Sequence, residues 1–317
     1  MPAPCAATIG HFDGVHLGHQ HVLRRLRLLA DERGLDSVMA ISFDRHPRTV
    51  FDTSFMPKML TTVDERRLIM SQIGVNVCAV LQFDSQMASM SARDFMREVL
   101  KEQLGVKLLL LGYDNRFGKR NPDEGFEDYV RYGKEMGIEV VECDPLELSD
   151  GKRVSSTLVR DLLADGRIEE ATEYLGHRYS VEGKIVNGFR EGRKIGFPTA
   201  NLDIDPLKII PASGVYAVKV HVEGDMVLHN GMMNIGHRPT YGENGLTLET
   251  NIFRFRENIY GKKIRVEFCK KLRNECRFDS VSALARQLAE DAMQANDYLF
   301  HPDALPLTRK RFLKATD

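Results

Sequence analysis

Short apolar runs alternate with helical patterns along the first 150 residues. Each run is rich in aliphatic or β-branched side chains, which is typical of buried strands. The predicted strands are residues 5–9, 37–43, 77–83, 107–112 and 138–142. Apolar residues recur at helical spacing between them, over residues 19–33, 62–73, 91–103 and 125–136. This alternation predicts an α/β fold with a parallel sheet covered by helices on both faces, and its ligands would bind at the carboxyl ends of the strands.

The pattern changes near residue 176. The later segments are short, alternate apolar with polar side chains and are bounded by Gly, Asn or Pro, which predicts antiparallel strands in a small barrel or sandwich. The predicted strands are residues 179–186, 214–222, 226–235, 246–256 and 262–269, followed by a helix over 279–299. We therefore predict two domains, an α/β domain over residues 1–175 and a β domain over residues 176–317.

The composition narrows the class of protein. Hydrophobic residues make up 43% and charged residues 28% of the 317 residues, and a chain of this length fits two domains. The net charge of −1 argues against a nucleic-acid partner. No apolar run approaches the roughly 20 residues of a membrane span. Five scattered cysteines without a Cys-x-x-Cys pair favour a reducing cytoplasm. Small-molecule substrates are the expected partners, and the oligomeric state stays open, a homo-oligomer included.

The most informative segment begins at Gly10 and reads Gly-His-Phe-Asp-Gly-Val-His-Leu-Gly-His-Gln. It lies between a predicted strand and a predicted helix. Gly10, Gly14 and Gly18 allow the backbone to approach a ligand, and the free N–H groups at a helix start attract anions. His16 and His19 stand one helical turn apart and are suited to holding phosphate oxygens. The segment therefore predicts a site for a phosphate chain.

Two other interpretations of these histidines stay open. Four histidines in eleven residues could form a metal site, although no cysteine or carboxylate has a spacing that would complete a zinc site. The histidines could also be surface residues of a helix without a role.

Other polar segments are expected to lie near the same phosphate site. Residues 43–47 and 112–118 follow predicted strands and so lie on the same rim of the sheet. Ser155, Ser156 and Thr157 precede a further helical segment, where hydroxyl and N–H groups can bind phosphates, and Arg160 follows one turn later. A Ser-Ser-Thr run alone is more often only a helix cap.

A second glycine-rich segment begins at Gly188 and reads Gly-Phe-Arg-Glu-Gly-Arg-Lys-Ile-Gly-Phe-Pro-Thr-Ala-Asn-Leu. Gly188, Gly192 and Gly196 allow a loop to wrap phosphates, and Arg193 or Lys194 can offset their charge. The alternative is an ordinary turn between strands.

Oxygen ligands follow in the same segment. Thr199 and Asn201 are two residues apart and share one face if the chain is extended, and hard oxygen ligands suit Mg²⁺. Glu249 is the only carboxylate in its predicted strand, where it alternates with Leu248 and Ile252. An exposed strand carboxylate without a role is the default interpretation of that position.

These motifs together resemble a known family. The first motif resembles the nucleotidyltransferase superfamily, whose signature is His-x-Gly-His. With the Val-Ser-Ser-Thr-Leu-Val-Arg run that begins at Val154, it resembles the FAD synthetase half of prokaryotic bifunctional riboflavin kinase/FAD synthetases. The second motif resembles the riboflavin kinase motif Gly-Arg-x-x-Gly-Phe-Pro-Thr-Ala-Asn. Further matches follow in the family's order at residues 234–240, 248–253, 260–261 and 272–273, so the resemblance covers nearly the whole chain.

The resemblance implies a fold and two reactions. It implies a Rossmann-like nucleotidyltransferase domain followed by an antiparallel β-barrel flavokinase domain with a terminal helix. The C-terminal domain would convert riboflavin and ATP to FMN and ADP, and the N-terminal domain would convert FMN and ATP to FAD and pyrophosphate. Both steps would need Mg²⁺, with ATP and the flavins as substrates or products.

The motifs and the resemblance together give a set of candidate site residues. Those expected to act in catalysis are His16, His19 and Glu249, with Glu249 as the general base. Those expected to bind ATP or phosphate are Gly10, Phe12, Asp13, Gly14, Gly18, Ser155, Ser156, Thr157, Arg160, Gly188, Gly192, Arg193 and Gly196. Those expected to bind flavin are Asn115, Arg116 and Phe117, and the expected metal ligands are Thr199 and Asn201.

Three positions depart from the family's pattern. Arg45 stands where the family has a proline, Asn115 where it has an aromatic residue, and Asn251 where it has a histidine. The departures at Arg45 and Asn115 leave open a riboflavin kinase whose nucleotidyltransferase domain is inactive or redirected. A non-catalytic regulator that binds flavin or nucleotide is a further alternative, although the chain has no helix-turn-helix signature.

Overall fold

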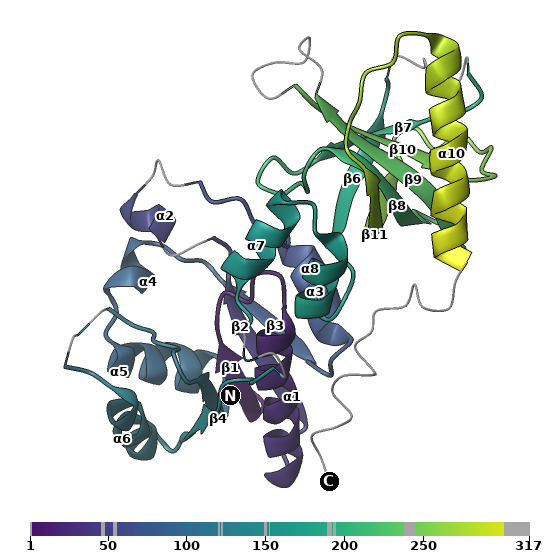
Figure 1. Cartoon of the computed structure of the whole chain (residues 1–317). Coiled ribbons are helices and arrows are strands. Elements are labelled where there is room, and N and C mark those ends of the chain that lie inside the picture. Colours follow the sequence, from purple (N-terminus) through teal and green to yellow (C-terminus); the bar gives the residue numbers. More distant parts are fainter. Residues whose placement is uncertain are drawn as a thin grey trace. The chain divides into compact units, whose positions relative to one another are not determined.

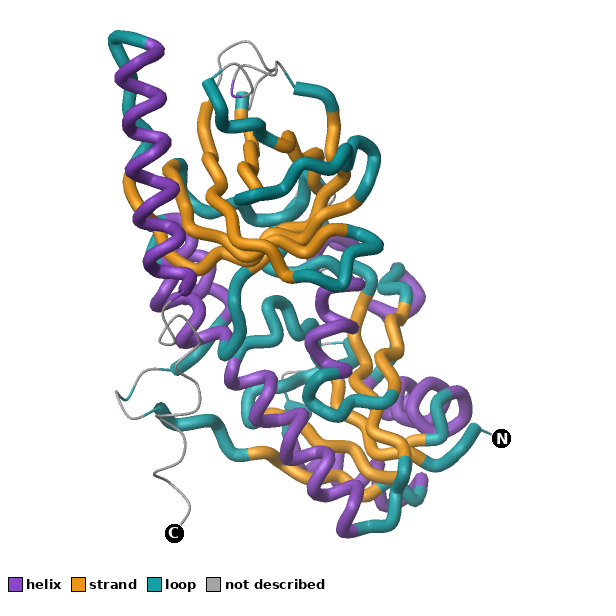
Figure 2. Tube along the Cα trace, turned by 90° about the vertical axis from the view of Figure 1, so that its right-hand side faces the viewer, coloured by secondary structure: helices purple, strands orange, loops and turns teal. Residues whose placement is uncertain are grey.

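The computed structural model describes residues 2–45, 48–52, 56–119, 121, 123–148, 151, 153–188, 192, 195–237 and 245–300. The chain forms two compact units, residues 1–156 and 157–317, and each is described by itself (Figures 1 and 2). The domain boundary expected at residues 175/176 stays a prediction.

A five-stranded parallel sheet forms the centre of the first unit (Figure 1). The strand order is β3-β2-β1-β4-β5, so β1 occupies the middle and its five residues are all buried. The strands are β1 (Cys5–Ile9), β2 (Ser37–Phe43), β3 (Val77–Leu81), β4 (Val106–Gly112) and β5 (Glu139–Cys143). The five strands expected from the sequence and their parallel pairing are confirmed.

Helices cover both faces of this sheet, as the alternation of strands and helices predicted. Successive strand residues point to opposite faces. Ala6, Ala40 and Leu108 pack with α1 and α3, whereas their neighbours Ala7 and Leu109 pack with η1 and α6. The helices are α1 (Leu17–Glu32), α2 (Arg48–Phe51), α3 (Val63–Ser71), α4 (Ser85–Ser89), α5 (Ala92–Asp94), η1 (Phe95–Gln103) and α6 (Phe126–Met136).

The helix expected over residues 91–103 differs in its geometry. It consists of one α-helical turn, α5, followed by the π-helix η1. Both pieces use their apolar side chains for the core, since Phe95, Met96, Val99 and Leu100 are all buried. The short helices α2 and α4 were not expected because four or five residues give too few turns for a helical pattern.

The second unit contains a closed antiparallel barrel with the strand order β10-β7-β6-β11-β8-β9 (Figure 2). The barrel, rather than a sandwich, is therefore the observed form of the expected antiparallel strands. The strands are β6 (Ser180–Val186), β7 (Ala200–Ile204), β8 (Gly214–Val222), β9 (Leu228–His237), β10 (Leu246–Ile252) and β11 (Lys263–Arg273). The helices are α7 (Ser156–Ala164), α8 (Ile168–Leu175) and α10 (Val281–Phe300).

Two elements of this unit were missed by the sequence analysis. Strand β7 falls within the glycine-rich motif, and among its residues only Leu202 is deeply buried, so its apolar signal is weak. Helix α8 lies in a segment for which no element was expected. Strand β10 ends at Ile252, four residues before the expected end, because the chain turns at Phe253.

Helix α10 packs against the barrel through a small apolar cluster. Ala295 and Leu299 of the helix contact Ala217 of β8, Met232 of β9 and Cys269 of β11. In the N-terminal half of α10, Leu284 and Leu288 line a cavity together with residues of the barrel strands.

Candidate functional site

A strained loop joins β1 to α1 in the first unit. Gly14 has a φ of 82°, and the non-glycine residues Phe12 and Val15 also have positive φ, at 51° and 40°. Positive φ in residues with a Cβ is uncommon and persists only where the surroundings enforce it. Phe12 and Val15 are both buried, which supplies that enforcement.

The two histidines of the loop lie face to face at the start of α1. The rings of His16 and His19 stack with their centroids 3.7 Å apart and their planes at 15°. His16 caps the helix, because its Nδ1 accepts the backbone N–H of His19 at 3.4 Å. Burial, and then the nearby His16, lower the pKa of His19 well below its ordinary value. The imidazole of His19 is therefore uncharged at neutral pH.

The carboxylate of Asp13 holds a neighbouring segment. It is 2% exposed and accepts hydrogen bonds from the backbone N–H of Leu60 at 3.1 Å, from the N–H of Thr61 at 3.0 Å and from the Thr61 hydroxyl at 3.2 Å. The Thr61 hydroxyl in turn accepts the N–H of Gly14 at 2.9 Å. The side chain of Asp13 is thus engaged in fixing the loop.

The candidate residues before α7 divide into two groups. Ser155 lines the same cavity as the histidines, whereas the hydroxyl of Ser156 donates to the backbone oxygen of Asp13 at 2.9 Å. Thr157 and Arg160 follow on α7 and belong to the second unit, so their phosphate-binding role stays a prediction.

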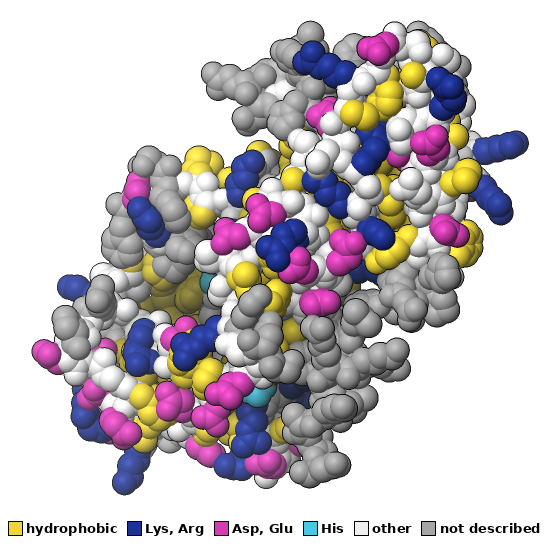
Figure 3. All heavy atoms as spheres, viewed as in Figure 1, with side chains coloured by type: hydrophobic (Ala, Val, Ile, Leu, Met, Phe, Trp, Pro, Cys, Tyr) yellow, Lys and Arg dark blue, Asp and Glu magenta, His cyan; other side chains and the backbone are white. Residues whose placement is uncertain are grey.

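Two cavities meet at the carboxyl end of β1. The first, of about 470 Å³, is lined by the loop residues Gly10, Phe12, His16, Gly18 and His19, together with Ser155 and other residues. The second, of about 720 Å³, is mostly apolar and is lined by aromatic, methionine and aliphatic side chains. Gly10, Asn115 and Arg116 line both cavities. Figure 3 shows a hollow in this unit with hydrophobic side chains at its floor and a histidine at its edge.

The three expected flavin-binding residues all line the apolar cavity. Phe117 stacks on Tyr129 with ring centroids 4.7 Å apart, so its ring is held rigidly in the wall. The amide of Asn115 donates to the backbone oxygen of Ile9 at the end of β1. Asn115 therefore braces the junction between the two cavities in the place where the family has an aromatic ring. Arg45, the other departure in this unit, is exposed and pairs with the adjacent Asp44 at 3.2 Å.

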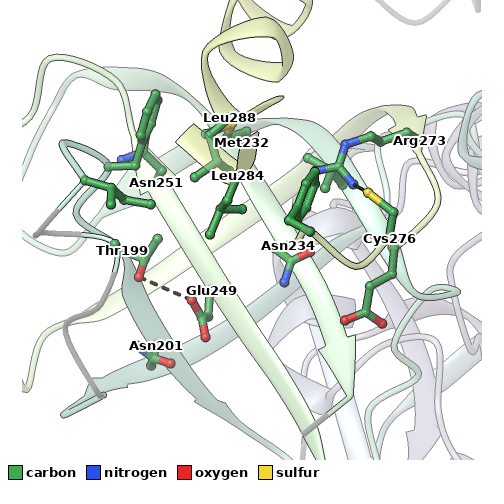
Figure 4. Close-up of a pocket in the computed structure, with 16 residues that line it drawn as sticks. Thr199, Asn201, Met232, Asn234, Glu249, Asn251, Arg273, Cys276, Leu284 and Leu288 are labelled. Carbon is green, nitrogen blue, oxygen red and sulfur yellow. Dashed lines mark hydrogen bonds between the residues drawn. The ribbon is translucent and has the colours of Figure 1, made fainter. Parts of the chain in front are cut away.

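The barrel brings its expected ligands and base together. Asn201 of β7 pairs in register with Glu249 of β10, and the Thr199 hydroxyl donates to Glu249 Oε2 at 3.4 Å. All three residues line a cavity of about 240 Å³. Figure 4 shows them grouped on one side, near the apolar side chains of Met232 and Leu284. Asn201 lies in strand β7 and Thr199 immediately precedes that strand.

The glycines of the second motif allow close backbone approach. A Cβ at Gly188 would lie 2.1 Å from the side-chain Nδ2 of Asn201. A Cβ at Gly192 would lie 2.2 Å from the backbone oxygen of Phe197. Gly196 has a φ of 85° with open space around it. Arg193 lies outside the described residues, so its phosphate-binding role stays a prediction.

A buried ion pair braces the other end of this cavity. Arg273, which lines the cavity, makes three hydrogen bonds of 2.7 to 3.1 Å to the carboxylate of Asp291 on α10. Asp291 is 1% exposed and also accepts from Gln287 at 3.1 Å. The pair therefore ties the end of β11 to the helix that covers the cavity.

A further cavity, of about 390 Å³, lies next to the motif. Pro198, Thr250 and Tyr260 line it, and Thr199 lines both this cavity and the smaller one. Because Thr199 contributes to both walls, its hydroxyl lies where ligands in the two cavities would meet.

Comparisons with known proteins agree with this geometry. A family model described as FAD synthetase matches residues 1–158, and one described as riboflavin kinase matches residues 175–299. The chain is 38% identical over 296 residues to a bifunctional riboflavin kinase/FMN adenylyltransferase of Haemophilus influenzae, covering 93% of this chain and 94% of that protein. The chain belongs to this family. Its members from Escherichia coli and Bacillus subtilis are 37% and 33% identical, and each alignment covers 93% of this chain and at least 92% of the relative.

A solved structure also matches over nearly the whole length. The crystal structure described as a macrolide-efflux protein from Streptococcus pneumoniae aligns with a TM-score of 0.84 and 30% identity, over 94% of this chain and 95% of that chain. In the described part of the chain, no helix is both long and apolar enough to cross a membrane.

Some residues that shape the sites were not expected from the sequence. Leu60, Thr61 and Arg66 fix the histidine loop from a distant segment. The sequence predicted a helix over residues 62–73, but nothing in its pattern pointed to this contact with the loop. Within the described ranges, no group of three His, Cys, Asp or Glu side chains is arranged to hold a metal ion. The alternative of a zinc site at the histidines therefore has no ligand set there.

Proposed function

We propose that the two units catalyse consecutive steps of flavin coenzyme synthesis. The second unit transfers the γ-phosphoryl group of ATP to riboflavin, and the first unit transfers the adenylyl group of a second ATP to the FMN that results. The observation that carries this proposal is the meeting of Thr199, Asn201 and Glu249 in one barrel cavity, in a chain whose other unit presents the stacked His16 and His19 to a separate cavity.

In the second unit, Glu249 acts as the general base. The ribityl hydroxyl oxygen attacks the γ-phosphorus, its proton passes to the Glu249 carboxylate, and ADP leaves. The hydrogen bond from Thr199 to Glu249 Oε2 orients the carboxylate before substrate binds. The apolar side chains of Met232, Leu284 and Leu288 suit the flavin ring, and the neighbouring 390 Å³ cavity suits the nucleotide. Transfer of this kind depends mainly on positioning and charge stabilisation.

The residues near Glu249 fit a Mg²⁺ ion. The Thr199 hydroxyl and the Asn201 amide oxygen are hard ligands two residues apart at the start of β7, and Mg²⁺ prefers such ligands together with water and phosphate oxygens. A Cβ at Gly188 would lie 2.1 Å from the side-chain nitrogen of Asn201, so the glycine leaves room for the Asn201 amide. When bound there, Mg²⁺ would neutralise charge on the transferred phosphate.

In the first unit, the histidine loop positions the ATP phosphates. An oxygen of the FMN phosphate attacks the α-phosphorus, and pyrophosphate leaves. His16, His19 and Ser155 line the polar cavity and would hold phosphate oxygens, whereas Phe117 and the apolar cavity would hold the flavin ring. Because Gly10 and Asn115 line both cavities, the two substrates would meet at the end of β1.

The substrates expected as partners are therefore small molecules, and we place the enzyme in the cytoplasm, where ATP and riboflavin are available. Incubation of the protein with FMN, ATP and Mg²⁺, followed by chromatography of the flavins, tests the first unit alone. FAD formation supports the proposal, whereas unchanged FMN would favour a kinase with an inactive first unit.

A further inference from the structure

Arg66 is a buried cation behind the histidine loop. It lies on α3 and is 3% exposed. Its guanidinium donates to the backbone oxygen of His11 at 2.6 Å, to the Ser42 hydroxyl at 2.9 Å and to the backbone oxygen of Phe43 at 3.4 Å. One side chain thus joins the first turn after β1 to the carboxyl end of β2.

The hydrogen bonds of Arg66 leave its charge uncompensated. All three acceptors are neutral oxygens, and its Nε is buried without a hydrogen-bond partner among the residues that the structure describes. Asp13 is the carboxylate that acts on it electrostatically, but the Asp13 oxygens are engaged with Leu60 and Thr61. Burial lowers the pKa of Arg66, yet an arginine remains protonated in proteins. A buried charge without an ion pair is costly unless a ligand compensates it.

The surroundings indicate the sign and place of that ligand. The oxygen that Arg66 holds belongs to His11, which lines the polar cavity together with His16 and His19. The charged or titratable groups that act on His19 are His16, His11 and Arg66, and all of them can only add positive charge. An anion in this cavity would therefore find a positive field that is established before it arrives.

We propose that Arg66 is a positioning residue of FMN adenylylation, which fixes the His11 carbonyl and supplies a buried positive charge that the ATP polyphosphate compensates. The inference rests on the proposed function of the first unit. Arg66 does not touch the nucleotide; it acts through the loop and through its charge.

Three variants separate the effect of the Arg66 charge from an effect on folding. They are Arg66→Met, Arg66→Lys and the control Arg67→Met. Arg67 follows on the same helix, is 51% exposed and is 3.6 Å from Asp64. With FMN as the flavin substrate, we expect Arg66→Met to raise the KM for ATP about ten-fold, the effect of losing one charge-assisted interaction. Arg66→Lys keeps the charge but not the fork of hydrogen bonds, so its KM should stay near that of the wild type while kcat falls. Arg67→Met should change neither constant.

Inhibition by inorganic triphosphate and by adenosine, each measured against ATP, distinguishes an electrostatic from a merely structural effect. Arg66→Met should weaken inhibition by triphosphate about ten-fold and leave inhibition by adenosine unchanged. An unchanged KM for ATP, or equal weakening of both inhibitors, would overturn the proposal. If Arg66→Met does not fold, Arg66→Lys provides the test. A raised KM for ATP with an unchanged kcat in Arg66→Lys would contradict the proposal. Failure of the wild type to form FAD would instead refute the proposed function.

Discussion

The side-chain amide of Asn251 donates a 2.7 Å hydrogen bond to the backbone oxygen of Pro198. Asn251 follows Glu249 by two residues on β10, and Pro198 immediately precedes Thr199. The bond therefore ties the strand that carries the carboxylate to the segment that carries the hydroxyl. The position where the resemblance implies a histidine is thus occupied by a residue that positions the site.

Removal of this tie should slow the kinase step. Asn251 is 7% exposed, and Asn251→Ala removes its hydrogen bond to the Pro198 carbonyl and so frees Thr199 to move. We expect the kcat for FMN formation to fall roughly ten-fold, equivalent to one lost hydrogen bond. The rate of FAD formation from FMN, measured on the same preparation, should not change. A normal kinase rate would show that the bond does not position Thr199.

Glu249→Gln tests the general base with little change in shape. The amide keeps the size of the carboxylate but cannot accept the hydroxyl proton, so FMN formation should fall by about 10² to 10⁴, the usual contribution of a positioned base. Flavins separated after incubation with riboflavin and ATP give the rate. A kinase rate within a few-fold of the wild type would exclude Glu249 as the base, and FMN adenylylation on the same preparation provides the control.

Asp13→Ala should unfold the histidine loop locally. The change removes three hydrogen bonds and leaves the buried N–H groups of Leu60 and Thr61 without their acceptor. We expect a loss of about 2 to 4 kcal/mol in the stability of the first unit, with slower FAD formation. Asp64→Ala is the matched control, because that side chain is 89% exposed. Equal urea midpoints for the two variants would contradict the role given to Asp13.

The ion pair between Arg273 and Asp291 should stabilise the closure of the barrel cavity. Asp291→Asn leaves the Arg273 guanidinium partly buried without its countercharge, and breaking a buried pair in this way costs about 3 to 5 kcal/mol. Because Arg273 lines the cavity, the KM for riboflavin should rise as well. Asp297→Asn, at an exposed position of the same helix, should leave both quantities unchanged. A KM equal to that of the wild type in Asp291→Asn would mean that the pair is not coupled to the substrate site.

His19 should make the first unit sensitive to acid. Its pKa is lowered in the folded protein, mainly by burial and then by His16, whereas an unfolded histidine titrates near pH 6.5. Below about pH 6.5 the unfolded chain therefore binds more protons, and the stability of the unit falls with the pH. The urea midpoint at which the far-ultraviolet circular dichroism of the helices is lost measures this dependence. It should decline more steeply from pH 7 to pH 5 in the wild type than in His19→Gln, and parallel declines would refute the assignment.

Local patterns were sufficient to predict the five parallel strands and the loop between β1 and α1 on which the candidate residues lie. Gly14 and Gly18 could be singled out because a strand, a turn and a helix start follow one another within a few residues. The candidate metal ligands Thr199 and Asn201 could be grouped because they are only two residues apart. In each case the relevant contacts are close in the sequence.

The features that escaped prediction depend on distant contacts. Arg66 reaches His11 across 55 positions, and nothing in its neighbourhood distinguishes it from the exposed Arg67. Strand β7 is defined by pairing with β6 and β10 rather than by its own apolar pattern. The carboxylate of Asp13 accepts hydrogen bonds from Leu60 and Thr61, 47 and 48 positions further along the chain, because its burial demands hydrogen-bond donors. Its expected role in ATP or phosphate binding stays a prediction.

The most direct test follows the flavins over time in a single reaction of the wild-type protein with riboflavin, ATP and Mg²⁺. We expect FMN to appear first and FAD to follow, with FMN formation lost in Glu249→Gln and FAD formation alone lost in His19→Gln. Accumulation of FMN without FAD in the wild type, loss of FMN formation in His19→Gln, or failure of Glu249→Gln to form FAD from added FMN would contradict two independent sites on one chain.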